Sequence, residues 1–481
     1  MNTARRSGTI IIPLIAVAVA LAPACGLACA GQTASASAPA GADQKISSIK
    51  QYGITWTFAA PAPAGRFVNG DWWVVGPVTV QAVDPAPAPG RSGSAVNPPA
   101  GRRQAYDDRV PGFDPNLRAS FPLELRPGES LVSTHSLAKV GDKTADTVPG
   151  QYCRGPLRTA VALTCVASPP PADAFRPAFA GNWKQAFTAS QLRRDLLPRL
   201  KYPGLLPDRA SLERYLQRIW LDHLAGWVGR MMHPLENMPD YGRELTNITS
   251  RTGLRLLLDD PNRENETLLI RFVQLGIDLY GMTQSNSNLW PANGGHCSGR
   301  KWPIIFAGIM LDHQGMQNVR ALFAEDEQTY YGEGYRGQKA LWRISGEEAR
   351  KHEHLPPDKW AGPPFKGDND GWKSEGYRGL NGPTWVGTAL AARLMGAKAN
   401  WKHDAFFDYM DRWVREAPNG MVDHKTMKPK GYQPFHSRPG FMKGMWEIYR
   451  PKADAIGAKM RAKRQGASAS TKPARQTEPS Q

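Results

Sequence analysis

The spacing of hydrophobic residues changes along the chain, and the change predicts two kinds of structure. In residues 50–170, apolar and polar positions alternate, as in Ile54-Thr-Trp-Thr-Phe58. A period of two places neighbouring side chains on opposite faces of a β-strand. From about residue 185 onward, apolar residues recur every three or four positions, which is the period of a helix with one buried face. The sequence therefore predicts a β-rich segment followed by a helical one.

Turn signals divide the β-rich segment into short strands. Asn69-Gly70 and Pro127-Gly128 each lie between two apolar runs and predict hairpins. A Pro- and Gly-rich insertion at residues 84–103 interrupts the strands, and residues 160–166 form the last of them. We predict a small all-β N-terminal domain over residues 50–170.

The helical segment contains several amphipathic repeats. The first follows Asp208, a natural helix N-cap, and its apolar face includes Leu212 and Leu216. The predicted helices are 212–228, 245–258, 266–280, 302–311, 319–324, 385–394, 405–415 and 441–449. They are too many for a four-helix bundle, and polar loops separate them. We predict a mainly α fold, an (α/α) toroid or incomplete barrel of helical hairpins over residues 180–452, preceded by the small all-β domain.

One short motif occurs twice in the helical segment. Glu333-Gly-Tyr-Arg-Gly337 recurs as Glu375-Gly-Tyr-Arg-Gly379. Two such loops on one rim of a toroid would bring tyrosines and arginines to a shared cleft. Glycine-rich loops also resemble one another by chance, and this alternative stays open.

The N-terminus has the composition of an export signal. Arg5 and Arg6 precede an apolar run and small residues, so residues 1–30 read as a secretory signal peptide. We expect a secreted or periplasmic protein. Cys25 and Cys29 leave a lipid anchor at the mature N-terminus as an alternative.

Two further segments have too little apolar content to build a core. Residues 31–49, rich in Ala, Ser and Gly, predict a linker, and residues 455–481 predict a disordered basic tail. No apolar run after the signal peptide is long enough to span a membrane.

The chain is strongly basic, with a formal net charge of +17. Such a charge favours a polyanionic partner, and export argues against nucleic acid. An anionic polysaccharide is the partner we expect, although a basic surface that is merely solvated would give the same composition.

The cysteines of the mature chain suggest one disulfide. Cys153 and Cys165 can pair in an oxidising compartment, which leaves Cys297 unpaired. Cys297 lies beside His296, but a small packed residue is a commoner use of such a cysteine than a nucleophile.

Candidate chemistry gathers in one loop, Asn293-Gly-Gly-His-Cys-Ser-Gly-Arg300-Lys301. Its glycines allow the backbone to approach a ligand closely, and its side chains supply a carboxamide, an imidazole and two cations. These groups suit β-elimination from a uronic-acid polymer, which requires neutralisation of the sugar carboxylate, a base and an acid. We expect Asn293 and Arg300 to neutralise the carboxylate and His296 to act as base.

A tyrosine completes this chemistry, and the loops offer several. We favour Tyr331, then Tyr335, as the proton-transfer partner of His296. Stacking on a sugar or plain packing is an equal alternative for each. The remaining residues that we expect to bind substrate are Asn237, Asn247, Lys301, Arg336, Tyr377, Arg378 and His403. A helix cap is the alternative for Asn247, and a structural role is the alternative for His403. The reaction needs no cofactor, and His352-Glu-His354 has no clear third ligand for a metal.

Several motifs together resemble a known family. They are Phe67-Val-Asn-Gly-Asp-Trp-Trp-Val-Val-Gly-Pro77, Asn293-Gly-Gly-His296, Glu325-Asp-Glu-Gln-Thr-Tyr-Tyr331, Trp385-Val-Gly-Thr-Ala-Leu390 and His403-Asp-Ala-Phe-Phe-Asp-Tyr409. The chain is similar in these motifs to bacterial polysaccharide lyases of the alginate and glucuronan type. The resemblance implies a toroidal lyase that uses asparagine, histidine, tyrosine and arginine without a cofactor.

Two other functions fit parts of the sequence. A glycoside hydrolase on the same architecture would need two carboxyl groups, which Asp370, Glu333 and Glu375 could supply. A non-catalytic binder of acidic polysaccharide would use the same arginines and aromatic residues without cutting the polymer.

Overall fold

A computed structural model of the protein describes residues 45–149, 154–332, 338–343, 375–420 and 440–470, all of which belong to one compact unit, Pro39–Gln481. The predicted signal peptide, with Cys25 and Cys29, lies outside the described residues. None of the helices in the described ranges combines the length and hydropathy that a bilayer crossing requires.

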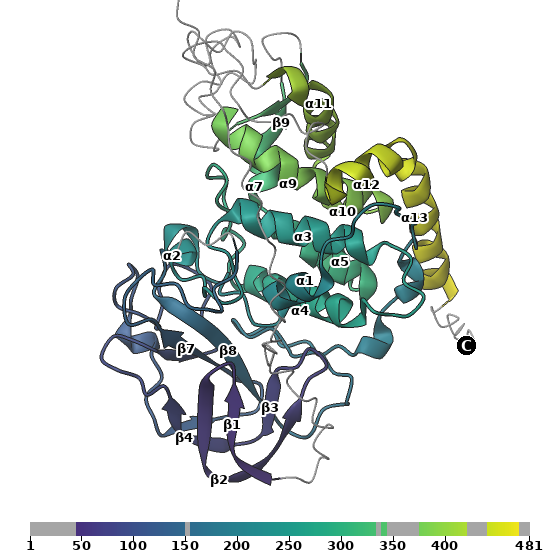
Figure 1. The fold of residues 1–481 in the computed structure, drawn as a ribbon. Helices are drawn as coiled ribbons and strands as arrows, with labels where there is room; N and C mark the ends of the chain where they lie inside the picture. The colour runs from purple at the N-terminus through teal and green to yellow at the C-terminus, as the bar shows by residue number, and fades with distance from the viewer. Residues whose placement is uncertain (1–44, 150–153, 333–337, 344–374, 421–439, 471–481) are drawn as a thin grey trace, which may run out of the picture. The chain divides into compact units, whose positions relative to one another are not determined.

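The strands lie mainly in the first third of the chain (Figure 1). They are β1 (Lys45–Gln51), β2 (Ile54–Arg66), β3 (Trp72–Val75), β4 (Val78–Asp84), β5 (Ser94–Val96), β6 (Leu123–Leu125), β7 (Ser130–Ser136), β8 (Leu157–Val166), β9 (Thr329–Tyr331) and β10 (Ala340–Trp342). Strands β1 to β8 form one sheet in the order β5-β7-β8-β3-β2-β4-β6, with β1 paired to β2 off this path. Strands β9 and β10 form a separate pair.

Helices dominate the chain after residue 205. They are α1 (Arg209–Leu216), α2 (Gly226–Met231), α3 (Gly242–Leu256), α4 (Glu266–Ser285), α5 (Lys301–Met310), α6 (Gln314–Gln317), α7 (Ala324–Gln328), α9 (Glu375–Leu394), α10 (Lys398–Trp401), α11 (Asp404–Gly420), α12 (Phe441–Tyr449) and α13 (Ala453–Ser470). Short 3-10 turns occur at η1 (Pro115–Leu117), η2 (Ala189–Gln191), η3 (Arg194–Leu196) and η7 (Arg450–Lys452). Helix α3 packs on α9, and α4 packs on α5.

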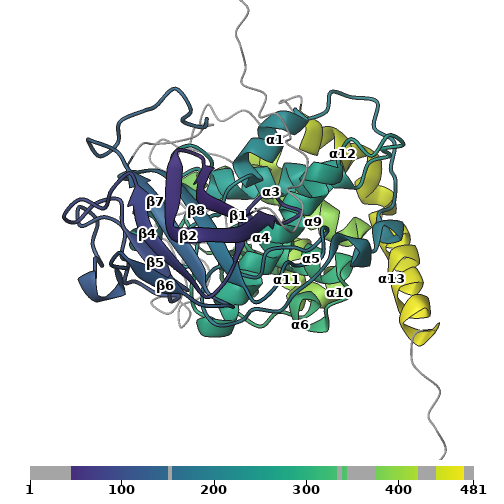
Figure 2. The ribbon, with the colours of Figure 1, turned by 90° about the horizontal axis from the view of Figure 1, so that it is seen from below.

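The predicted fold class is wrong. The protein is a mixed α and β structure, with 38% helix and 20% strand and a sheet that curls into a half-barrel, and it is not a mainly α toroid preceded by an all-β domain. The sheet shares its core with the helices: Val132 of β7 and Leu157 of β8 belong to the same hydrophobic cluster as Leu245 of α3 and Leu268 of α4. Figure 2 shows strands β4 to β7 in one part of the structure and helices α3, α5 and α9 in the other.

The predicted bounds of four helices are close to the observed ones. Helix α12 has the predicted bounds, and α3 to α5 begin and end within a few residues of them. The predicted helix 212–228 is instead two helices, α1 and α2, which the non-helical residues 217–225 separate. Gly226, the first residue of α2, adopts a φ of +63°, which favours glycine. Asp208 caps the first of these, since its side chain accepts a hydrogen bond from Ser211 N at 2.7 Å.

Two other predicted elements differ from the structure. The predicted helix 319–324 is not formed: Phe323 makes a β-bridge with Trp290 and precedes α7. Pro127-Gly128 does not close a hairpin, because β6 pairs with β4 whereas β7 pairs with β5 and β8. Asn69-Gly70 does connect the antiparallel pair β2 and β3.

Order extends further toward both ends than the sequence predicts. Strand β1 begins at Lys45, inside the predicted linker, because it pairs along β2. Helix α13 runs through Ser470, inside the predicted disordered tail. This helix packs on α9 and buries Ala453 and Arg464. Tertiary contacts therefore stabilise a segment whose composition predicts disorder.

The predicted disulfide is not formed. Cys165 is a free, buried thiol in β8 whose Sγ donates to Leu125 O at 3.4 Å, and Cys153 lies outside the described residues.

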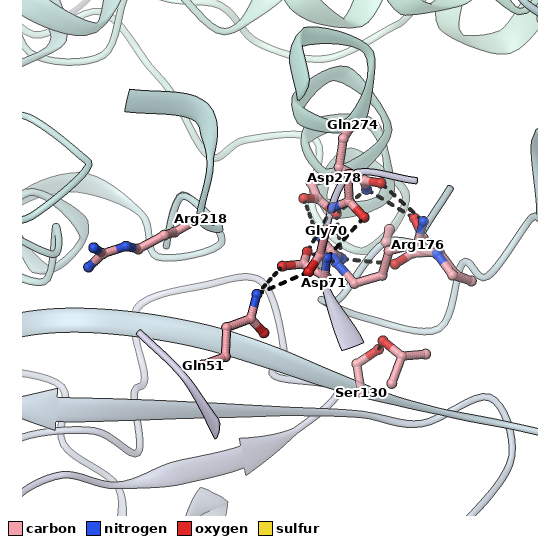
Figure 3. A network of polar contacts seen from close by, with 12 residues as sticks. Gln51, Gly70, Asp71, Ser130, Arg176, Arg218, Gln274 and Asp278 are labelled. Carbon is pink, nitrogen blue, oxygen red and sulfur yellow. Dashed lines mark hydrogen bonds and ion pairs between the residues drawn. The ribbon is translucent and has the colours of Figure 1, made fainter. Parts of the chain in front are cut away.

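A buried polar network joins the sheet to helix α4 (Figure 3). Arg176 donates from Nε to Asp71 Oδ2 at 2.6 Å and from Nη1 to Asp278 Oδ1 at 2.9 Å. Gln274 holds the Arg176 backbone at both ends, accepting from its N–H and donating to its carbonyl. Gln51 of β1 donates to Asp71 Oδ1 at 3.3 Å and completes the link to the sheet.

Candidate functional site

A cleft of about 970 Å³ lies beside the glycine loop. This volume is within the range of small-molecule and sugar sites. Its walls come from the loop after β5, the start of α2, the segment after α4 and helix α7: Gly101, Arg102, Ala225, Gly226, Trp227, Val228, Asn286, Asn288, Pro291, Ala292, Asn293, Cys297, Leu322 and Glu327. Of the predicted site residues, Asn293 lines this cleft.

Trp227 is the aromatic wall of the cleft. Its side chain is 53% exposed, and its ring stacks on His296 with centroids 5.1 Å apart and planes inclined by 22°. The Arg230 guanidinium lies 4.7 Å from the centre of the same ring. Because His296 and Arg230 are both buried, they hold the indole from inside and leave more than half of its surface open to a ligand.

Arg102 supplies a positive charge to the cleft. The backbone next to it is tied to the segment that precedes Trp227: Gly101 N donates to His223 O at 2.8 Å, and Ala225 N donates to Gly101 O at 2.7 Å. The Arg102 side chain is exposed and forms no ion pair with any residue in the described ranges. It is therefore available to an anionic ligand.

The glycine loop is fixed by side chains from α7 and α9. Gly294 adopts a φ of +55°, and its carbonyl accepts hydrogen bonds from Gln328 Nε2 at 2.6 Å and Asn381 Nδ2 at 2.9 Å. Gly299 N donates to Glu325 Oε1 at 2.8 Å. These bonds give the loop one conformation and set where Asn293 and Cys297 meet the cleft.

His296 is less suited to act as a base than the sequence suggests. It is 5% exposed, and its Nδ1 lies 3.1 Å from Cys297 Sγ. Burial, with the positive field of Arg300, His233 and Arg230, lowers the pKa of His296 to about 3. At neutral pH the imidazole is uncharged and only weakly basic.

Cys297 lines the cleft as a thiol. Burial raises its pKa to about 12, so it lacks the thiolate character that a nucleophile needs.

The two cations of the loop are neutralised inside the protein. Arg300 donates to Asp222 through Nε and Nη2, at 2.9 and 2.8 Å. Lys301 contacts the carboxylate of Asp326 and donates to Trp401 O at 2.6 Å. Their burial and pairing favour a structural role over binding of a substrate carboxylate.

The other predicted residues are dispersed. Asn237 is fully buried and donates to two backbone carbonyls, and Asn247 is half-buried in the second turn of α3. Tyr331 is 55% exposed and donates to Asp408 Oδ2 at 2.5 Å, and His403 contacts Thr329 O at 2.8 Å. None of these four lines the cleft.

Several predictions fall partly or wholly outside the described residues. Tyr335, Arg336, Glu333, Asp370, His352 and His354 lie outside them. Tyr377 and Glu375 lie in α9, but their side chains are not described, whereas Arg378 of the same helix is buried. The second copy of the repeated motif is thus helical and not a rim loop.

Sequence reasoning missed Arg102, Trp227 and Glu327. Trp227 lies inside the predicted helix 212–228, yet the glycine before it is a signal for a break in that helix. Arg102 carries no local signal, because its place in the cleft depends on contacts with residues more than a hundred positions away.

In the described part of the chain, no three His, Cys, Asp or Glu side chains group closely enough to hold a metal ion.

No protein-family model, curated protein or solved structure matches this chain.

Proposed function

We propose that the protein binds a uronic-acid polysaccharide in the Trp227 cleft and cleaves it by β-elimination. The observation that supports this proposal is that one cleft contains both an exposed indole, Trp227, and a cation, Arg102, that forms no ion pair within the described ranges. An exposed indole packs against the apolar face of a sugar ring, and a guanidinium binds a carboxylate through two parallel hydrogen bonds. Together they select an acidic sugar.

The carboxamides on the cleft walls fit the same ligand. Asn288 and Asn293 are exposed, and Asn286 is half-buried beside them. A carboxamide both donates and accepts, which suits the hydroxyl groups of a sugar. The polymer's negative charge also fits the protein's net charge of +17.

The small number of carboxylates among the described residues of the cleft favours elimination over hydrolysis. A hydrolase needs two carboxyl groups on either side of the scissile bond. Among the described residues that line the cleft, Glu327 is the carboxylate. A non-catalytic binder would use the same walls, and it predicts an unchanged polymer length.

The test is ultraviolet absorbance of the new double bond. The purified chain is incubated with alginate, its mannuronate-rich and guluronate-rich blocks, glucuronan, hyaluronan and chondroitin. We expect absorbance to rise with at least one polymer. New reducing ends without absorbance would indicate hydrolysis, and retention on the polymer without either signal would indicate a binder.

Substitutions of two neighbouring arginines test whether the cleft binds the substrate. Arg103 neighbours Arg102 but pairs with Asp114 at 2.8 Å and does not line the cleft. Arg102→Met should lower kcat/KM by about tenfold or more, since a charge-assisted hydrogen bond is lost. Arg103→Met should leave it unchanged, and equal effects of the two substitutions would contradict this use of the cleft.

A further inference from the structure

Glu327 is held in a defined orientation at the cleft wall. Its Oε2 accepts a hydrogen bond from Ala292 N at 2.6 Å, next to Asn293. Its backbone carbonyl accepts from Arg343 Nε at 2.6 Å, which fixes the end of α7. Its Oε1 makes no hydrogen bond within the described ranges, so one oxygen orients the carboxylate while the other remains available.

The neighbouring carboxylates are occupied by other contacts. Asp222 is bound by Arg300, and Asp326 is bound by Lys301 and Trp401. Glu325 is 1% exposed beneath the loop and accepts from Gly299. Glu327, which is half-buried and lines the cleft, is the carboxylate of α7 that a ligand can reach.

We infer that Glu327, and not His296, is the general base of the proposed elimination. The inference rests on the proposed function and assigns its chemistry to a group that the cleft exposes. His296 lies behind Trp227, with Nδ1 against a thiol, whereas Glu327 has at the cleft wall an oxygen to which no described residue donates a hydrogen bond.

The step balances without a cofactor. Glu327 Oε1 takes the C5 proton of the uronate, the C–H electron pair forms the C4–C5 double bond, and the C4–O4 bond breaks. The leaving oxygen takes a proton from water, and the protonated Glu327 later returns its proton to solvent. Arg102 pairs with the uronate carboxylate, which makes the C5 proton more acidic by stabilising the negative charge that develops.

Glu327→Gln separates proton transfer from binding. The amide oxygen can still accept from Ala292 N, but the side chain can no longer take a proton. We expect turnover, followed by absorbance, to fall at least about 100-fold, in line with the contribution of general bases. Affinity for the polymer, measured by retardation in a polysaccharide-containing gel, should stay within about threefold. Glu264→Gln, an exposed substitution outside the cleft, is the matched control and should change neither quantity.

Chemical rescue provides a second readout. In Glu327→Ala, added formate should restore part of the turnover, because a small carboxylate can occupy the vacated place and accept the proton. A structural role would not respond to formate.

The outcomes distinguish the two proposals. If wild-type protein cleaves a polymer but Glu327→Gln keeps its turnover, or loses turnover and binding together, the base assignment is wrong while the proposed function stands. Failure of formate to restore turnover would also count against the base. If wild-type protein produces no double bond on any of the polymers, the proposed elimination fails and this inference fails with it.

Discussion

Arg300 and Asp222 form a two-point ion pair beneath the glycine loop. The guanidinium Nε lies 2.9 Å from Oδ2 and Nη2 lies 2.8 Å from Oδ1, and the two side chains are 3% and 2% exposed. Arg300 Nη1 donates to Ser298 O at 2.7 Å, so the pair also fixes the loop backbone. Arg300, which we predicted to bind the substrate, therefore has a structural role: it fixes the backbone of the glycine loop.

Arg300→Met should destabilise the fold. It leaves the Asp222 carboxylate buried without its partner, which typically costs about 3–5 kcal/mol. Urea unfolding measures the loss. Arg103→Met, which removes an exposed pair, should cost at most about 1 kcal/mol. Similar losses in the two variants would argue against a structural role for the buried pair.

Glu325 should make stability depend on pH. Burial raises its pKa to about 7, because the carboxylate loses water that its hydrogen bond from Gly299 only partly replaces. The folded state therefore binds the proton more tightly than the unfolded state. The resulting stability is present below about pH 4.5 and is lost as the pH rises through 7.

Glu325→Gln removes this dependence. The free energy of unfolding of the variant, relative to wild type, should rise between pH 4 and pH 8 by about 3 kcal/mol, since each pKa unit corresponds to about 1.4 kcal/mol. Urea unfolding at both pH values measures the difference, and Glu264→Gln is the exposed control. A difference that is the same at both values would show that burial does not raise the pKa of Glu325.

Local sequence predicted the elements better than their arrangement. Helix α12 has the predicted bounds, because a regular apolar period defines it. No comparable signal in the local sequence indicates which elements pack against each other. The sheet order depends on β8 lying parallel to β3, a contact between residues about ninety positions apart.

The prediction of the fold class was wrong for the same reason. The number of helices and the polar loops between them indicated a toroid. Periodicity shows only that one face of an element is buried, and it does not show which other element covers that face. The face of the sheet that carries Val132 and Ala162 packs with helical residues instead of closing a separate domain. Composition likewise missed α13, whose order comes from packing on α9.

The roles predicted for the side chains of the glycine loop came from their residue types alone. Arginine and lysine near a ligand loop suggest anion binding, and only the structure reveals that Asp222 and Asp326 already neutralise them. Residues brought in from other segments, such as Arg102, could not be found because the cleft forms only on folding.

Arg176→Met should destabilise the fold by removing the polar link between the sheet and helix α4. The substitution leaves Asp71 and Asp278 buried without the guanidinium that joins them, and we expect a loss of about 3–5 kcal/mol. Two unneutralised carboxylates resist ionisation, so the variant should lose more stability at pH 8 than at pH 5. Unfolding at both values measures this, and a pH-independent loss would mean that packing and not charge accounts for the effect.

Trp227→Ala should weaken polymer binding with little loss of stability. The indole is 53% exposed, so its removal takes away a ligand surface more than core packing. We expect affinity in a polysaccharide-containing gel to fall about tenfold, a usual cost for an aromatic anchor. Tyr331→Ala is the matched control, because Tyr331 is equally exposed at 55% but does not line the cleft. Trp227→Phe should retain part of the affinity, since a smaller ring still stacks on a sugar. If Tyr331→Ala weakens binding as much as Trp227→Ala does, the polymer is not held by the Trp227 cleft alone, and the site must extend to the face that carries β9.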